Sequence, residues 1–440
     1  MTSVPGLSFR WEWEPAPSVR APELRKTWAR IEISVGAEYV TLLEDLESGS
    51  SRRSIYCPLY PLAEWAAYNW WFLRADARLA RYADLSRPDR LDPRRLRRHS
   101  LRGSGDGFVW PNLLILPEGI GKRLIWCRDR SHLTAQRPVR FISDGEVLLD
   151  RVSVEQELVR LISAVLTRLA EQGITGTPLE KEWTAIQGAE PDEVEFCLAS
   201  ARLGLDPYSE AEPYQQLIVR AASELRDDLL GDFYDAVEPA LLGSALEWIR
   251  EARSDIEHVS ARTDAAALRE AVWQGPQRTS LSSASLAWEK GWEQARAVRR
   301  ALGLADTAEI ALEPYIAHVT RQPADSGLLA LGGATEGFGP VAVTKPGLPM
   351  TASRFTLSRA LWHYLWESEP FFLVTTAYTD RQRVERAFAT ELLAPASGIG
   401  TLLDGSPEMA ISDDIEEIAA RYRVSPMVIK HQVENQLLTA

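Results

Sequence analysis

The sequence predicts an α+β fold in three parts. Apolar and polar residues alternate over residues 9–14 and 29–35, which is the period of half-buried strands. Residues 151–280 show the period of amphipathic helices instead. The last third combines short apolar strands with helices. We therefore expect an N-terminal mixed α/β domain at residues 1–150, a helical domain at 151–280 and a third domain at 285–440.

The elements follow in order from these patterns. In the first part, a strand near residues 39–42 precedes a helix over 62–73, whose many aromatic residues indicate a buried docking helix. Further strands are expected at 112–116, 123–126 and 139–142, and residues 145–150 lead into a long helix. In the middle part we expect helices at 154–170, 191–201, 217–230 and 240–252.

The composition is that of an ordinary globular protein. The chain of 440 residues is 45% hydrophobic and 25% charged, with a formal net charge of −13. The acidic total argues against a dedicated nucleic-acid coat. The three cysteines are far apart and show no metal spacing, so we expect buried free thiols in a reducing cytoplasm. No signal peptide is expected at residues 1–10, and the richest apolar run, 58–73, is too short to cross a membrane.

A basic stretch interrupts this acidic chain. Residues 87–103 contain seven arginines against two aspartates and lead into a glycine-rich linker. One interpretation is a solvated loop that pairs with acidic faces of the same chain. The other is a patch for nucleic acid or an acidic partner, formed by Arg94, Arg95, Arg97 and Arg98.

Two segments of the last third carry a motif. Residues 354–365 read RFTLSRALWHYL, and residues 384–395 read VERAFATELLAP. Together they resemble the ImmA/IrrE family of zincin-like metallopeptidases, in which the corresponding words are close to RFTLAHELGHLL and E-A-N-x-F-A-x-E-L-L-x-P. The resemblance covers roughly residues 285–440 and begins with an early helix near 292–302, followed by Gly303 as its C-cap. It implies a degenerate zincin-like domain.

The resemblance also implies where zinc chemistry would lie. In HExxH, two histidines on one helix face bind zinc, and the glutamate takes a proton from the bound water. Here the first histidine position holds Arg359, whose guanidinium has no lone pair for a metal. The glutamate position holds Ala360, and the third-ligand position falls on Val384. Only His363 stays in register, so we assign no catalytic residue and no metal ligand.

A rebuilt metal site is the alternative. His363 and Glu367 are four residues apart, and Glu385 is near in sequence, so these three could hold a zinc ion. The simpler interpretation is that Glu367 is a solvated charge at a helix end and His363 a relic of the site.

The strands and the C-terminus complete the predicted domain. Residues 327–333 and 339–344 predict two short strands, and in active relatives an edge strand of this kind lies beside the cleft and holds peptide by strand addition. Residues 412–422, with Ser412 as N-cap, and a helix opened by Ser425 and Pro426 predict a helix-turn-helix-like pair. Its first helix is acidic, which favours packing over DNA binding.

These observations lead to one function and two alternatives. Active members of the family cut helix-turn-helix repressors. The resemblance therefore implies a catalytically inactive regulator or sensor in the cytoplasm that binds a protein or peptide partner, in gene regulation, anti-phage defence or a toxin–antitoxin module. We expect no cofactor and no membrane. The first alternative is a zinc endopeptidase with a rebuilt site that cleaves a repressor, and the second is a nucleic-acid-binding regulator that uses residues 87–102.

Overall fold

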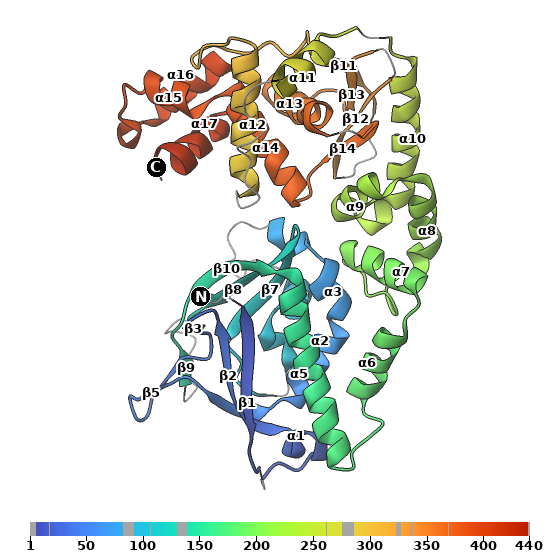
Figure 1. Ribbon diagram of the computed structural model, residues 1–440, viewed down its shortest axis with the longest axis vertical. Coiled ribbons are helices and arrows are strands. Elements are labelled where there is room, and N and C mark those ends of the chain that lie inside the picture. Colours follow the sequence, from blue (N-terminus) through green and yellow to red (C-terminus); the bar gives the residue numbers. More distant parts are fainter. Residues whose placement is uncertain are drawn as a thin grey trace. The chain divides into compact units, whose positions relative to one another are not determined.

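The chain forms two compact units, Met1–Pro213 and Tyr214–Ala440, in a computed structural model (Figure 1). The structure describes residues 6–16, 18–81, 92–105, 107–129, 139–260, 262–274, 286–322, 327–335, 338–367 and 369–438. Both units mix helices with small, mostly antiparallel sheets, as the α+β prediction requires. The sequence-based boundaries at 150 and 280 fall inside these units. No helix in the described part of the chain is long and apolar enough to span a bilayer.

The first unit contains three small antiparallel sheets. In the first, β2 (Trp28–Val35) pairs with β1 (Leu7–Trp13), β3 (Glu38–Tyr39) and β6 (Ile55–Pro58). In the second, β8 (Gly121–Cys127) lies between β7 (Asn112–Glu118) and β10 (Gly145–Asp150). In the third, β4 (Leu43–Asp45) lies between β5 (Ser51–Arg52) and β9 (Val139–Phe141). The strands predicted from alternation are therefore confirmed, although the one near residue 39 is only two residues long.

Helices cover these sheets in one main core. They are α1 (Pro22–Lys26), α2 (Tyr60–Tyr68), α3 (Trp70–Ala75), α4 (Pro93–His99), α5 (Arg151–Glu171), α6 (Pro178–Gly188) and α7 (Pro191–Arg202). A smaller apolar cluster lies between β7, β8 and α4. The long helix α5 packs against β1, β10 and α2. Trp65, Trp70 and Trp71 are almost fully buried in this core, so the aromatic segment is the buried docking element that its composition predicts.

Two predicted helices are each divided in two. The aromatic helix breaks at Asn69, where the backbone leaves helical geometry with φ −104° and ψ 14°. The Trp65 carbonyl accepts from both the backbone amide of Asn69 at 3.0 Å and its side-chain amide at 2.8 Å. The helix predicted at 217–230 is α8 (Gln215–Glu224) followed by α9 (Asp227–Ala236), because the backbone at residues 225–226 is extended.

The second unit is built around a four-stranded sheet. Its order is β11 (Ala317–Thr320), β13 (Pro340–Thr344), β12 (Leu328–Ala334) and β14 (Phe371–Thr375). The remaining helices are α10 (Leu242–His258), α11 (Ala265–Gln274), α12 (Ala287–Ala301), α13 (Met350–Trp366), α14 (Asp380–Leu393), α15 (Ala396–Leu402), α16 (Ser412–Tyr422) and α17 (Pro426–Gln432), followed by a π-helical turn at Val433–Leu437. The predicted hairpin strands at 327–333 and 339–344 are confirmed as β12 and β13. The expectation that one of them is an edge strand is wrong, because both are paired on two sides.

Close packing joins the helices that carry the motif. Helix α14 packs along α12, and α13 packs against α14 and against β12, β13 and β14 (Figure 1). Gly291 in α12 allows this approach, because a Cβ atom there would overlap the Val384 carbonyl and lie 2.8 Å from the Ala387 Cβ. The buried Arg299 then donates to the Leu392 carbonyl at 2.8 Å, which satisfies one of the free acceptors at the end of α14.

The C-terminal helices belong to the same core. Ile418, Val424 and Ile429 are buried where α16 meets α17, as the helix-turn-helix-like pattern predicts. Ser425 and Pro426 open α17 as expected. The cap of α16 differs from the prediction. Ile411 precedes the helix, and its amide donates to the Asp414 side chain at 3.1 Å, so Ser412 is the first helical residue and not the cap.

Candidate functional site

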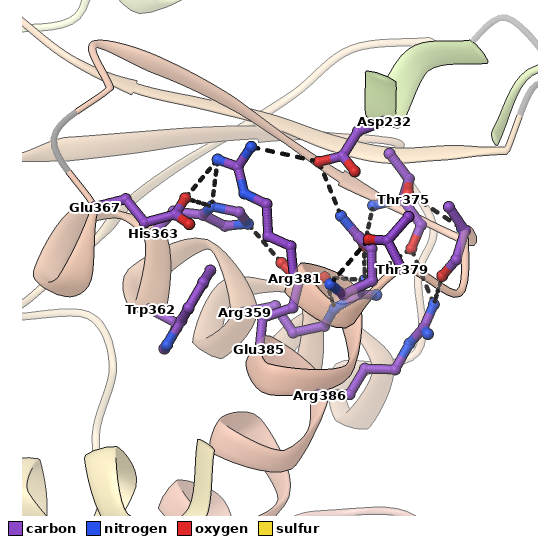
Figure 2. A network of polar contacts seen from close by, with 12 residues as sticks. Asp232, Arg359, Trp362, His363, Glu367, Thr375, Thr379, Arg381, Glu385 and Arg386 are labelled. Carbon is purple, nitrogen blue, oxygen red and sulfur yellow. Dashed lines mark hydrogen bonds and ion pairs between the residues drawn. The ribbon is translucent and has the colours of Figure 1, made fainter. Parts of the chain in front are cut away.

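A buried ion network lies between α13, α14 and α9 (Figure 2). We define this network by the side chains that link to one another there. Arg359 and His363 lie on successive turns of α13, and Glu367 caps its end. The other members are Arg381, Gln382 and Glu385 of α14 and Asp232 of α9. The network therefore contains His363, Glu367 and Glu385, the three residues of the predicted rebuilt site, together with Arg359 of the relic site.

Arg359 provides the innermost cation. It is 2% exposed, and its Nε donates to Glu385 Oε1 at 2.8 Å. Its Nη2 donates to the same carboxylate, to Gln382 Oε1 at 2.7 Å and to the Thr375 carbonyl at 2.7 Å. Acceptors from α14 and from β14 thus converge on one guanidinium. A pair of hydrogen bonds from arginine to one carboxylate is a strong interaction in a buried setting.

His363 lies between two carboxylates. Its Nδ1 is 2.8 Å from Glu367 Oε2, and its Nε2 is 2.5 Å from Glu385 Oε2. Burial lowers the pKa of His363, but the hydrogen bonds to both carboxylates outweigh burial and raise this pKa above its ordinary value. Burial raises the pKa of Glu385, but Arg359 and His363 lower it below its ordinary value. The two carboxylates thus favour an imidazolium that donates from both nitrogens, whereas the Arg381 guanidinium, 3.1 Å from Nδ1, opposes the added charge.

The packing below His363 follows from glycines in the sheet. The Phe372 ring stacks on the His363 ring with centroids 4.6 Å apart and planes 9° apart. Gly332 pairs with Phe372 across the strands, and a Cβ atom at Gly332 would overlap the Phe372 ring. The glycine in β12 therefore leaves room for the ring that holds His363 in place.

Arg381 and Asp232 extend the network toward α9. Arg381 Nη2 donates to Glu367, and its Nη1 lies 3.6 Å from Asp232 Oδ2. Gln382 Nε2 also donates to Asp232 Oδ2, at 3.2 Å. Burial raises the pKa of Asp232 to about 7, and the attraction of Arg381 offsets this only in part. Three cationic side chains thus face three carboxyl groups in this network.

This arrangement does not fit a zinc site. The two ring nitrogens of His363 point in opposite directions, so Glu367 and Glu385 lie on opposite sides of the ring and do not converge on one point with it. The guanidinium of Arg359 adjoins Glu385, where a cation would have to approach. Among the described residues, no three His, Cys, Asp or Glu side chains form a group that could hold a metal ion.

The other relic positions lie in the core. Ala360 is fully buried, and Val384 is 5% exposed and packs in the same hydrophobic core. The residue of α14 that faces His363 is Glu385, one position after the predicted third-ligand position. Sequence reasoning missed Arg381 and Asp232. Arg381 is four residues before Glu385 on α14 and so has a local signal, whereas Asp232 on α9 has none.

The basic stretch is partly helical and not the predicted loop. From Pro93 it forms α4, whose N-cap Asp92 accepts from the Arg94 amide at 2.9 Å, while residues 87–91 lie outside the described part. Arg98 donates to the Gly204 carbonyl at 2.8 Å and to Glu210 at 2.9 Å. Arg95 lies 3.9 Å from Asp92 and is half-buried, whereas Arg94 and Arg97 are exposed. Arg98 thus pairs with its own unit, as the first interpretation of this stretch expects.

Comparison of the chain with models of known protein families gave no match, and comparison with curated proteins gave none either.

Proposed function

We propose that the second unit is a metallopeptidase-like regulatory module without catalytic activity, which binds a protein or peptide partner. In this proposal residues 285–440 form a degenerate ImmA/IrrE-like domain that ends in a helix-turn-helix-like pair. The setting is a cytoplasmic regulatory circuit, such as phage defence or a toxin–antitoxin module. The proposal of an ImmA/IrrE-like domain rests on the resemblance of the two motif segments. The proposal that this domain has lost its catalytic activity rests on the buried ion network.

One observation carries the proposal. The Arg359 guanidinium binds Glu385 between α13 and α14, where the motif would require a metal ligand and a metal. A fixed cation of the protein thereby provides the charge that a zinc ion would provide to these groups. Such a buried pair keeps two helices in register without a nucleophile or a base. A peptidase-like unit without catalytic groups can still bind a protein or peptide, and binding is the role that we assign to it.

Metal content tests the loss of chemistry. Zinc would be measured by mass spectrometry in the purified full chain, in His363→Ala and in the double variant Arg359→His with Ala360→Glu. We expect only traces of zinc in the full chain, unchanged in His363→Ala. We expect about one zinc per chain in the double variant, because it restores HExxH beside Glu385. One zinc in the unmodified chain that is lost in His363→Ala would overturn the proposal in favour of a rebuilt endopeptidase.

Partner capture tests the binding role. The full chain would be cross-linked in its source cells, and cross-linked peptides would be identified by mass spectrometry. We expect a partner that is cross-linked to residues 214–440 and recovered at full length. A partner recovered as two fragments, with cleavage abolished in His363→Ala, would contradict an inactive protein.

A further inference from the structure

A cavity of about 830 Å³ lies in the second unit, apart from the buried ion network. It is bordered by α12, the first turns of α13, the outer face of α14 and α17. A cavity of this size is typical of sites for small organic ligands. None of the residues that define the buried ion network lines this cavity.

Its walls are aromatic and only partly covered. Trp288, Trp292, Phe355 and Tyr378 line the cavity, and all four are half-buried, unlike the tryptophans of the first unit's core. Met427, at the start of α17, also lines the cavity and is 66% exposed. Flat aromatic walls of this kind stack on flat ligands.

Its charge is positive in an acidic protein. Arg383, Arg386 and His431 line the cavity, and the described residues that line it include no Asp or Glu. Arg383 lies over the Trp288 ring at 4.8 Å and over the Tyr378 ring at 5.4 Å, and it is 3.6 Å from Asp380 outside the lining. Arg386 donates to the Ala377 carbonyl at 2.7 Å, a contact that fixes its position.

We propose that this cavity binds a small anionic ligand that carries a flat aromatic ring. The ring stacks against the aromatic walls, and the anionic group meets Arg383 and Arg386. A nucleoside monophosphate and an aromatic carboxylate share this chemistry. The inference does not depend on the proposed function, because the cavity and the buried ion network use different residues.

The test uses 8-anilinonaphthalene-1-sulfonate as an aromatic anionic probe of the full chain. Its fluorescence titration is expected to show one site. Ala352→Phe fills the cavity and should abolish this binding, and Arg383→Gln should weaken it about tenfold or more. Arg300→Gln, an exposed arginine of α12 outside the cavity, is the matched control and should bind like the unmodified chain. Circular dichroism confirms that each variant is folded. Equal affinity in Ala352→Phe, Arg383→Gln and the unmodified chain would overturn the proposal.

Competition identifies the source of the ligand. Adenosine 5′-monophosphate and indole-3-acetate would each be titrated against the bound probe, with adenosine and indole-3-ethanol as their uncharged counterparts. We expect one of the two anions to displace the probe, and we expect the uncharged counterpart of that anion not to displace it. The anion that displaces the probe identifies the chemical class of the ligand. Displacement by neither anion, or equal displacement by the uncharged molecules, would overturn the proposal. Zinc content plays no part in either readout, so this test fails or succeeds separately from that of the proposed function.

Discussion

Replacing Arg359 by methionine should destabilise the second unit strongly. The substitution keeps most of the side-chain volume but leaves the fully buried Glu385 carboxylate with His363 as its remaining charged partner. Removal of one member of a buried ion pair costs about 3–5 kcal/mol. The two neutral acceptors add little to this figure, because the Thr375 carbonyl still accepts from Arg386 and Gln382 Oε1 still accepts from the Thr375 amide.

A double-mutant cycle isolates the interaction. Urea unfolding, followed by circular dichroism, would be measured for Arg359→Met, for Glu385→Gln and for the double variant. We expect the cost of Arg359→Met to fall by about 2 kcal/mol when Glu385 is already glutamine, because no buried charge is then left without its partner. Hydrogen exchange of the amides in α13 and α14 should rise in the single variants, which places the effect in this unit.

The same pair has a defined pH dependence. The pKa of Glu385 is lowered in the folded state, so the pair stabilises the fold above the ordinary carboxyl pKa of 4.5. This contribution is lost as the pH falls through the lower folded-state pKa. The cost of Arg359→Met should therefore shrink in acid. A cost below about 1 kcal/mol at pH 7, or one unchanged by Glu385→Gln, would refute the role assigned to Arg359.

Three further outcomes are expected. The pKa of Asp232 is raised to about 7, so its burial costs more as the pH rises toward 7. In urea unfolding, the free energy of unfolding of Asp232→Asn should therefore rise by about 3 kcal/mol relative to that of the unmodified chain between pH 5 and pH 8. A difference between the two proteins that does not change with pH would contradict this. Gly332→Ala should lower stability by about 1–3 kcal/mol in thermal unfolding, because its Cβ meets the Phe372 ring, whereas the control Gly243→Ala should not destabilise. Glu391→Ala should speed hydrogen exchange in α17 while leaving β12 protected, and uniform exchange across both would argue against a local role.

Short-range patterns predicted the elements but not all of their limits. The apolar period predicted α13 and α14, and turn chemistry predicted the opening of α17 at Pro426. The division of the aromatic helix at Asn69 was missed because apolar residues continue on both sides of this position, so the apolar pattern gives no sign of a break. The cap of α16 was missed by one residue because the Ile411 amide donates to the Asp414 side chain, and the apolar pattern does not register this bond.

The site was predictable only where its members are close in sequence. The four-residue spacing placed Arg359 and His363 on one face of a helix, and their residue types indicated the loss of zinc ligands. The motif spacing placed Val384 at the third-ligand position. One residue turns a helix by about 100°, and the residue that faces His363 is Glu385, one position later. The contribution of Asp232 depends on how α9 packs against β14 and so reaches Gln382, which no local pattern records.

Glu391 determines how far the chain can be shortened. Its fully buried carboxylate accepts from Arg296 at 2.8 Å, from Gln432 at 2.7 Å and from Gln436 at 2.9 Å. An expression fragment that stops before α16 would remove both glutamines and leave this carboxylate with fewer partners inside the protein. The C-terminal helix pair is consequently not an interchangeable attachment that evolution or a protein engineer could swap freely. Any exchange of this segment must bring its own donors for the carboxylate of α14.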